Sequence, residues 1–341
     1  MPEAEASPGA PCRRVALVGA GLVGAGWAIV FARAGVEVAL FDAQPGQAAR
    51  ALRSIAGSLA DLERLGLLRE PPAAIAARIA IADSLQAALA GADYVQESIV
   101  ERLEDKRRVY AEMDALAAPQ AVLASSTSAF PISAMAMGLP GRARCLVAHP
   151  VNPPYLVPLV EVSGADFTAE ASVQRTLALQ RAVGQAPIHV RREVHGFVLN
   201  RLQWTLLAEA CRLVADGVAS VDDVDAAIRD GLGRRWAFMG AFEVGDLNAP
   251  GGLRDYLERF GPTIETINEA SGFRLDPAQV QALHAARRAL LPEAGRADRM
   301  QWRDRRLMAL TRHLAEAEPA AAAPEAPDQA ADAATTEGRR G

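Results

Sequence analysis

The sequence predicts an α/β protein in which a doubly wound parallel sheet is followed by an all-α domain. In the first half of the chain, short apolar runs alternate with helical patterns, as expected for strands joined by helices. From Gly196 onward, apolar residues recur at helical spacing, every three to four positions. Half of the 341 residues are hydrophobic, so the chain can bury a substantial core.

Each element of the first half follows from these patterns. RVALV at residues 14–18 indicates a buried strand, because a short continuous apolar run is typical of a parallel sheet. A glycine turn and a helix to about Ala34 come next, and VEVALF at 36–41 indicates the second strand. A long helix then runs through Leu65, and another covers 102–117. The remaining strand candidates are ARIAI, DYVQES, AVLAS, RCLVAH, LVEVSG and PIHVRR.

The chain divides into four predicted segments. An α/β domain at 13–192 is followed by a helical domain at 193–315. A leader at 1–12 and an Ala/Pro/acid-rich tail at 316–341 have little apolar surface to bury, so we expect both to be disordered. The longest apolar pattern of the helical domain predicts a largely buried helix over 196–217.

Charge and cysteine content exclude several classes of protein. The net charge of −5 supplies no basic field, so we expect neither a nucleic-acid partner nor an anionic membrane surface. The three cysteines lie far apart, which indicates reduced thiols and no metal site. The chain has no apolar signal core and no apolar run of the ~18 residues that a membrane span needs. These features predict a cytoplasmic protein.

A glycine-rich turn joins the first strand to the first helix. Gly19, Gly21 and Gly24 form GAGLVG, in which the first glycine permits the turn and the third lets helix and strand pack closely. The middle glycine would let the backbone approach a pyrophosphate, held by the free N–H groups of the helix start at Leu22 and Val23. An ordinary tight turn is the alternative, but the strand–turn–helix context favours a dinucleotide site in a Rossmann-type domain.

An acidic residue narrows the choice of dinucleotide. Asp42 ends the second strand and follows Gly21 by 21 residues. A carboxylate at this place accepts hydrogen bonds from the adenosine ribose and repels a 2′-phosphate. Because no arginine follows in FDAQPG, the sequence predicts NAD rather than NADP.

One of the five histidines lies where open α/β sheets place their ligands. His149 ends a strand in VAHPVNPPYLVPLVEV, Glu161 follows on the next apolar run, and an SSTS turn ends the preceding strand. A histidine at a strand end is often structural. When a carboxylate holds one ring nitrogen, however, the tautomer is fixed and the other nitrogen suits a general base for an alcohol proton.

These motifs carry a family resemblance from about Arg13 to Leu310. VALVGAGLVGAGWA, SSTS, HPVNPP, LVEV and GFVLNRL resemble the 3-hydroxyacyl-CoA dehydrogenase superfamily. Within it, the chain is most similar to the lambda-crystallin / L-gulonate 3-dehydrogenase branch. That closer likeness rests on LVAHPVNPPYLVPLVEV, GLGRRWAFMGAFEVGDLNAPG and QWRDRRLMAL.

The resemblance implies catalytic roles for four residues. His149 would be the base and Glu161 its orienting carboxylate. Ser128 of SSTS and Asn200 of GFVLNRL would bind the reacting hydroxyl or the imidazole. Oxidation of a 3-hydroxy group by NAD is therefore implied.

The resemblance also implies cofactor contacts. Glu101 and Lys106 would line the nicotinamide-side ribose, although Lys106 could instead be a surface lysine. Asn152 would lie beside the nicotinamide, and Asp42 matches the adenosine-ribose carboxylate. Ser126, also assigned to the cofactor site, stands where the acyl-CoA enzymes usually have Asn, whereas SST resembles the gulonate branch.

A second departure from the acyl-CoA enzymes lies at RRWAFMG, which in those enzymes resembles a Pro-Met-Gly-Pro turn. A guanidinium matches a carboxylate bidentately. We therefore hypothesise that Arg235, ahead of Arg234, binds the free carboxylate of a hydroxy acid. A surface arginine at a helix end is the alternative.

The resemblance thus implies an NAD-dependent dehydrogenase of a small hydroxy acid, with L-gulonate as the expected substrate. Related branches leave 3-hydroxyacyl-CoA or carnitine as alternatives at the same carbon. An NAD-binding structural protein would need none of the catalytic set, and a redox-sensing regulator would need a DNA-reading helix or basic face. Relatives pair through the helical domain, so a homodimer is expected, with the substrate between the sheet edge and that domain.

Overall fold

The computed structural model describes the chain from Cys12 to Ala317, with several gaps in the helical domain. The predicted tail lies outside the described residues from 318 onward, as does the predicted leader up to residue 11. The described residues are 12–237, 240–250, 252–269, 278, 289 and 292–317.

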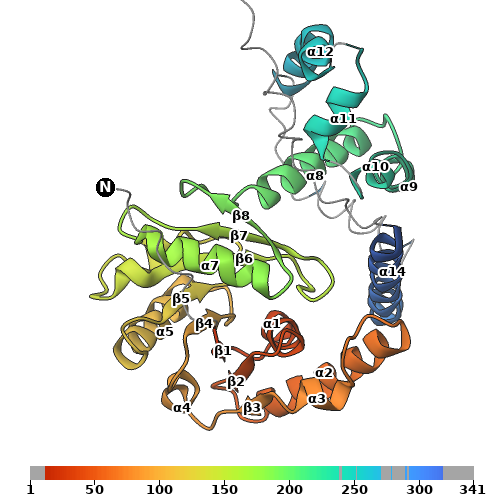
Figure 1. Ribbon diagram of the computed structural model, residues 1–341. Coiled ribbons are helices and arrows are strands. Elements are labelled where there is room, and N and C mark those ends of the chain that lie inside the picture. The colour runs from red at the N-terminus through yellow and green to blue at the C-terminus, as the bar shows by residue number, and fades with distance from the viewer. Residues whose placement is uncertain are drawn as a thin grey trace, which may run out of the picture.

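An eight-stranded sheet forms the first half of the protein, in the order β3-β2-β1-β4-β5-β6-β7-β8 (Figure 1). The strands are β1 (Arg14–Val18), β2 (Glu37–Phe41), β3 (Ile79–Ile81), β4 (Tyr94–Glu97), β5 (Val122–Ser125), β6 (Cys145–Pro150), β7 (Leu159–Ser163) and β8 (Ala186–Val190). All eight predicted strands are therefore present.

The sequence predicts a parallel sheet, whereas the observed sheet is mixed. β1 to β6 are parallel, but β7 is antiparallel to β6, and β8 is parallel to β7. The reason is the short loop at 151–158, because a crossover between parallel strands needs about a dozen residues or more. β7 can only return beside β6 in the opposite direction.

Helices cover both faces of the sheet (Figure 1). Val15 and Leu17 of β1 pack in one core cluster with α1, α2, α3 and α7, whereas Ala16 and Val18 pack in a second with α4, α5 and α6. Burial on both faces explains why these strands are continuous apolar runs. The helices are α1 (Leu22–Arg33), α2 (Gln47–Arg64), α3 (Pro72–Ala76), α4 (Leu85–Leu89), α5 (Leu103–Leu116), α6 (Ile132–Ala136) and α7 (Glu170–Ala182), with the 3-10 turn η1 (Arg142–Arg144).

Helices make up the second part of the chain, as predicted. Its elements are α8 (Leu199–Ala215), α9 (Val221–Ala226), the π-helical turn η2 (Ala227–Leu232), α10 (Gly233–Trp236), α11 (Ala241–Leu247), α12 (Gly252–Glu269), the 3-10 turn η3 (Glu293–Gly295) and α14 (Arg296–Ala317). α14 returns toward α2, and its Met308 is buried in the first core cluster of the sheet domain (Figure 1). No helix of the described part is both long and apolar enough to cross a bilayer.

The long helix predicted over 196–217 is present as α8, but it is less buried than its pattern suggested. Only Asn200 and Cys211 of α8 are buried, and the Leu202 and Leu207 side chains are 67% and 58% exposed. The other helices that the structure describes leave these apolar positions uncovered.

The functional side chains gather at the carboxyl ends of the parallel strands. The glycine turn follows β1, Asp42 follows β2, Ser98 follows β4 and the SSTS turn begins at the end of β5. His149 lies at the end of β6. Carboxyl ends of parallel strands meet at one edge, which is where ligands bind in open α/β sheets.

Candidate active site

The glycines of the turn after β1 divide their roles as the sequence predicted. Gly19 has a positive φ of 102°, and a Cβ on it would lie 2.5 Å from the Ser98 carbonyl oxygen. A Cβ on Gly24 would collide with the Gly19 carbonyl oxygen. Gly21 is exposed, and nothing lies within 4 Å of a Cβ placed there. The outer glycines thus close the turn, and the middle one leaves the open space that a pyrophosphate needs.

The surroundings of the turn also fit a dinucleotide. α1 begins without a side-chain cap, so its first N–H groups can face an anion. The Asp42 carboxylate is held beside the turn, because its Oδ2 accepts from the Ala20 N–H at 2.7 Å and its Oδ1 accepts from the Gln44 N–H at 2.8 Å. Each oxygen retains a lone pair that a ribose hydroxyl can use.

Asn152, in the loop after β6, also points to a ligand at this edge of the sheet. Its Oδ1 is buried and has no hydrogen-bond partner among the described residues. The loop packs on the cofactor helix, since a Cβ on Gly26 of α1 would lie 2.6 Å from the Pro154 ring. A buried amide oxygen without a donor is costly, and a bound ligand with an N–H group would satisfy it.

His149 and Glu161 form a buried pair across β6 and β7. They are partners in the antiparallel register, and His149 Nδ1 lies 2.8 Å from Glu161 Oε2. Because an ionised carboxylate only accepts, Nδ1 carries a proton, and in the neutral imidazole Nε2 then keeps the lone pair. The Phe197 ring packs on the imidazole at a centroid distance of 5.4 Å. The pair can therefore act as an oriented base.

The same carboxylate holds the start of the helical domain. Glu161 Oε1 accepts from the backbone N–H groups of Val198 and Leu199, at 2.8 and 2.9 Å, where α8 begins. The preceding Gly196 and Phe197 both have positive φ, 77° and 48°, which is unusual for phenylalanine. One side chain thus orients the histidine and fixes the junction between the two parts of the chain.

Ser128 and Asn200 are also brought together. Asn200 is buried, and its Nδ2 donates to the Ser128 carbonyl at 3.1 Å while its Oδ1 accepts from Gln203 Nε2 at 2.6 Å. Ser128 is exposed, and both of its backbone polar groups are used. Its hydroxyl is therefore the group that can face a substrate.

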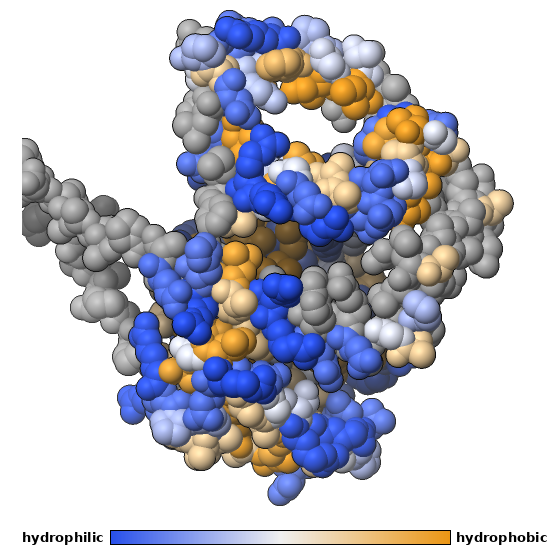
Figure 2. Space-filling model, turned by 90° about the vertical axis from the view of Figure 1, so that its right-hand side faces the viewer, coloured by the Kyte–Doolittle hydropathy of each residue, from blue (hydrophilic) through white to orange (hydrophobic). Residues whose placement is uncertain are grey.

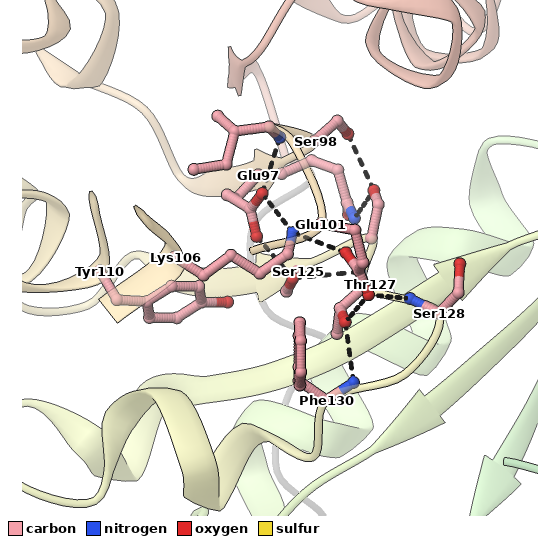
Figure 3. A network of polar contacts seen from close by, with 12 residues as sticks. Glu97, Ser98, Glu101, Lys106, Tyr110, Ser125, Thr127, Ser128 and Phe130 are labelled. Atoms are coloured by element: carbon pink, nitrogen blue, oxygen red, sulfur yellow. Dashed lines mark hydrogen bonds and ion pairs between the residues drawn. The ribbon is translucent and has the colours of Figure 1, made fainter. Parts of the chain in front are cut away.

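Lys106 is not the surface lysine that the sequence left as an alternative. Its side chain is 1% exposed, and Nζ lies 2.8 Å from Glu97 Oε1 and 3.2 Å from Glu101 Oε2 (Figure 3). Glu97 is fully buried and also accepts from Ser125 Oγ at 2.5 Å and from the Ile99 N–H at 2.7 Å. Lys106 is therefore the shared countercharge of two carboxylates, those of Glu97 and Glu101.

Glu101 holds the SSTS turn in place. Its Oε1 accepts from the Thr127 hydroxyl and from the N–H groups of Ser128 and Ala129 (Figure 3). Burial alone would raise the pKa of Glu101, but the Thr127 hydrogen bond and the Lys106 charge outweigh it and lower the pKa. The ionised carboxylate thereby positions the backbone that carries Ser128.

Glu97 and Phe197, which contact Lys106 and His149, had no role in the sequence prediction. A polar pair in DYVQES, a strand buried on both faces, was the available sign of Glu97, because buried polar side chains need partners. No sequence feature marked Phe197 as a residue of the site. Arg235 lies on α10 with an exposed side chain, and its substrate role stays a prediction.

The sheet edge thus combines a place for a dinucleotide with a base that can take an alcohol proton. This is the chemistry of an NAD-dependent dehydrogenase that acts on hydroxy groups. Sequence profiles then give the family: the 3-hydroxyacyl-CoA dehydrogenase NAD binding domain matches residues 14–194, and the C-terminal domain of these enzymes matches 196–287. The chain belongs to the 3-hydroxyacyl-CoA dehydrogenase family.

Individual relatives include both the branch predicted from the sequence and L-carnitine dehydrogenases. The chain is 43% identical over 312 residues to the lambda-crystallin homolog of Bos taurus, a match that covers 89% of this chain and 97% of the relative. It is 42% identical over 263 residues to the L-carnitine dehydrogenase of Streptomyces griseus subsp. griseus, covering 75% and 78%.

Solved structures show the same architecture. An NAD+-dependent 5-formyl-3-hydroxy-2-methylpyridine 4-carboxylic acid 5-dehydrogenase superposes with a TM-score of 0.71 at 28% identity, covering 90% of this chain and 100% of the other. The (S)-3-hydroxybutyryl-CoA dehydrogenase of Ralstonia eutropha gives a TM-score of 0.65 at 25% identity, covering 80% and 94%.

Proposed function

We propose that the protein oxidises the 3-hydroxy group of a small hydroxy acid with NAD, and that its substrate is L-gulonate, which becomes 3-dehydro-L-gulonate. The observation that carries the chemistry is the buried His149–Glu161 pair, whose fixed tautomer leaves Nε2 with a lone pair. The similarity to lambda-crystallin homologs supports the choice of substrate branch.

In the proposed reaction, His149 Nε2 takes the proton of the substrate hydroxyl. Glu161 stabilises the imidazolium that forms, since its Oε2 already accepts from Nδ1. Bound NAD supplies the acceptor for the hydride that leaves carbon 3. The Ser128 hydroxyl and the remaining N–H of Asn200 Nδ2 orient the substrate oxygen.

The test is a comparison of substrates with one purified sample. Steady-state rates with NAD are measured for L-gulonate, L-carnitine and 3-hydroxybutyryl-CoA, and we expect the highest kcat/KM with L-gulonate. L-carnitine is the second candidate, because carnitine dehydrogenases are similarly close relatives and carnitine is also a 3-hydroxy acid. A sample that binds NADH but oxidises none of the three would contradict the proposal and favour a structural role.

Arg235 gives a prediction about the far end of the substrate. If its guanidinium binds the carboxylate, Arg235→Met is expected to raise KM for the hydroxy acid by about 10- to 100-fold, the effect of losing a charge-assisted hydrogen bond. The affinity for NADH should not change. Arg234→Met is the matched control and should leave KM within about threefold. An unchanged KM in Arg235→Met would remove Arg235 from the site.

For the assembly we propose a homodimer through the helical domain, in the cytoplasm. Exposed apolar side chains on α8 and α12 support an interface there: Leu202, Trp204, Leu207, Leu257, Phe260, Ile264 and Ile267. The upper part of Figure 2, which contains the helical domain, shows hydrophobic groups on its surface among hydrophilic ones. The free thiols Cys12, Cys145 and Cys211 agree with a reducing compartment.

A further inference from the structure

Ser98 lies against the glycine turn, although no sequence motif points to this residue. It follows β4, and its carbonyl oxygen is the atom that a Cβ on Gly19 would meet. Its own Cβ lies 3.8 Å from the position of a Cβ on Gly24. Figure 3 shows its hydroxyl at the end of the polar network. The side chain is half-buried, at the sheet edge beside the glycine turn.

A chain of buried hydrogen bonds leads to this hydroxyl, and its directions are determined by two groups. The Ala148 carbonyl can only accept, so the Gln96 atom 3.1 Å from it is Nε2. The other N–H of Nε2 donates to Ser126 Oγ at 2.7 Å. The Tyr94 hydroxyl donates to Gln96 Oε1 at 2.8 Å, which agrees with this orientation.

Ser126 has only one way to use its own proton. The Trp27 indole N–H, which can only donate, also reaches Ser126 Oγ, at 3.1 Å. A hydroxyl oxygen has two lone pairs, and Gln96 and Trp27 occupy both. Ser126 must therefore donate to Ser98 Oγ, 2.9 Å away. It follows that Ser98 accepts from Ser126, and the Ser98 proton points elsewhere.

We propose that Ser98 donates this proton to an oxygen of the bound dinucleotide. The accepting oxygen belongs either to the pyrophosphate or to the second ribose, on the nicotinamide side. Within the described part of the chain, the Ser98 hydroxyl has one hydrogen-bond partner, Ser126, which donates to it and therefore cannot accept its proton. The buried chain behind it keeps it a donor, and a phosphate oxygen accepts strongly because it is charged. The proposal depends on the NAD site alone and not on the substrate proposed above.

The test measures cofactor binding without any hydroxy acid. Its outcome is therefore independent of which substrate the enzyme oxidises. In Ser98→Ala, the dissociation constants of NADH and of ADP-ribose are expected to rise by about 3- to 30-fold, the effect of one lost hydrogen bond to a charged acceptor. NADH is followed by its fluorescence and ADP-ribose by calorimetry. The dissociation constant of AMP, which lacks the pyrophosphate and the second ribose, should stay within about twofold.

Two variants control for general damage. Ser98→Thr keeps the hydroxyl and should bind NADH within about threefold of the unchanged protein. Ser58→Ala removes a hydroxyl of α2 that pairs with Tyr155, and it should not alter NADH binding. Equal NADH affinity in Ser98→Ala and the unchanged protein would overturn the proposal. An equally large loss for AMP would overturn it too, because it would indicate damage to the adenosine side.

Discussion

Glu161→Gln is expected to lower kcat by about 10³- to 10⁴-fold while the affinity for NADH stays within about twofold. The cause is the orientation that the structure imposes on the new amide. Glu161 Oε1 accepts from two backbone N–H groups at the start of α8, and only an oxygen can do so. The amide oxygen must therefore occupy this position, which turns the NH₂ group toward His149 Nδ1.

An NH₂ group at Nδ1 changes the tautomer of His149. Nδ1 must then accept, the ring proton moves to Nε2, and the lone pair that should take the substrate proton is lost. The same carboxylate-to-amide change in a serine protease triad lowers kcat by about 10⁴ for this reason. The substitution is nearly isosteric, so the fold and the glycine turn should remain.

The measurements are kcat, the dissociation constant of NADH and the tautomer of His149 from its ¹⁵N chemical shifts. The shifts should report a proton on Nε2 in Glu161→Gln and on Nδ1 in the unchanged protein. His149→Ala is the control for complete loss of the base, and combining the two changes should reduce kcat little further. A kcat within tenfold of the unchanged enzyme would show that the amide does not reverse the tautomer.

The histidine pair illustrates what sequence patterns could predict here. His149 and Glu161 were assigned from strand-end positions and motifs, and the structure places them opposite each other in the β6–β7 register. The second role of Glu161, toward Val198 and Leu199, could not be predicted. This role depends on the backbone conformation at the start of α8. Phe197 has a positive φ there, and no local sequence pattern predicts it.

Lys106 shows why the cofactor side was harder to predict. Its neighbours on α5 are charged residues typical of a solvated helix face, and a lysine among them looks exposed. The rotation of α5 against the sheet decides otherwise, because it directs this one side chain inward onto Glu97. Similarly, the apolar pattern of α8 could not show that several of its apolar side chains are exposed in the folded chain.

Lys106→Met is expected to destabilise the folded protein by about 3–5 kcal/mol. Glu97 is fully buried, and Lys106 is its countercharge at 2.8 Å. Removing one partner of a buried ion pair leaves an uncompensated charge, which costs far more than the pair itself contributes. The hydrogen bonds from Ser125 and Ile99 remain, but neither carries a charge.

The free energy of unfolding from urea titration measures this effect, and two further variants separate charge from packing. Arg108→Met removes an ion pair on the same helix, but Arg108 is 66% exposed, so the loss should stay below about 1 kcal/mol. Glu97→Gln/Lys106→Met leaves no buried charge, and most of the stability should return. If Lys106→Met cost no more than Arg108→Met, Glu97 would not depend on Lys106 for its charge. If the double variant were as unstable as the single one, the loss would arise from packing of the lysine stem and not from the unpaired charge of Glu97.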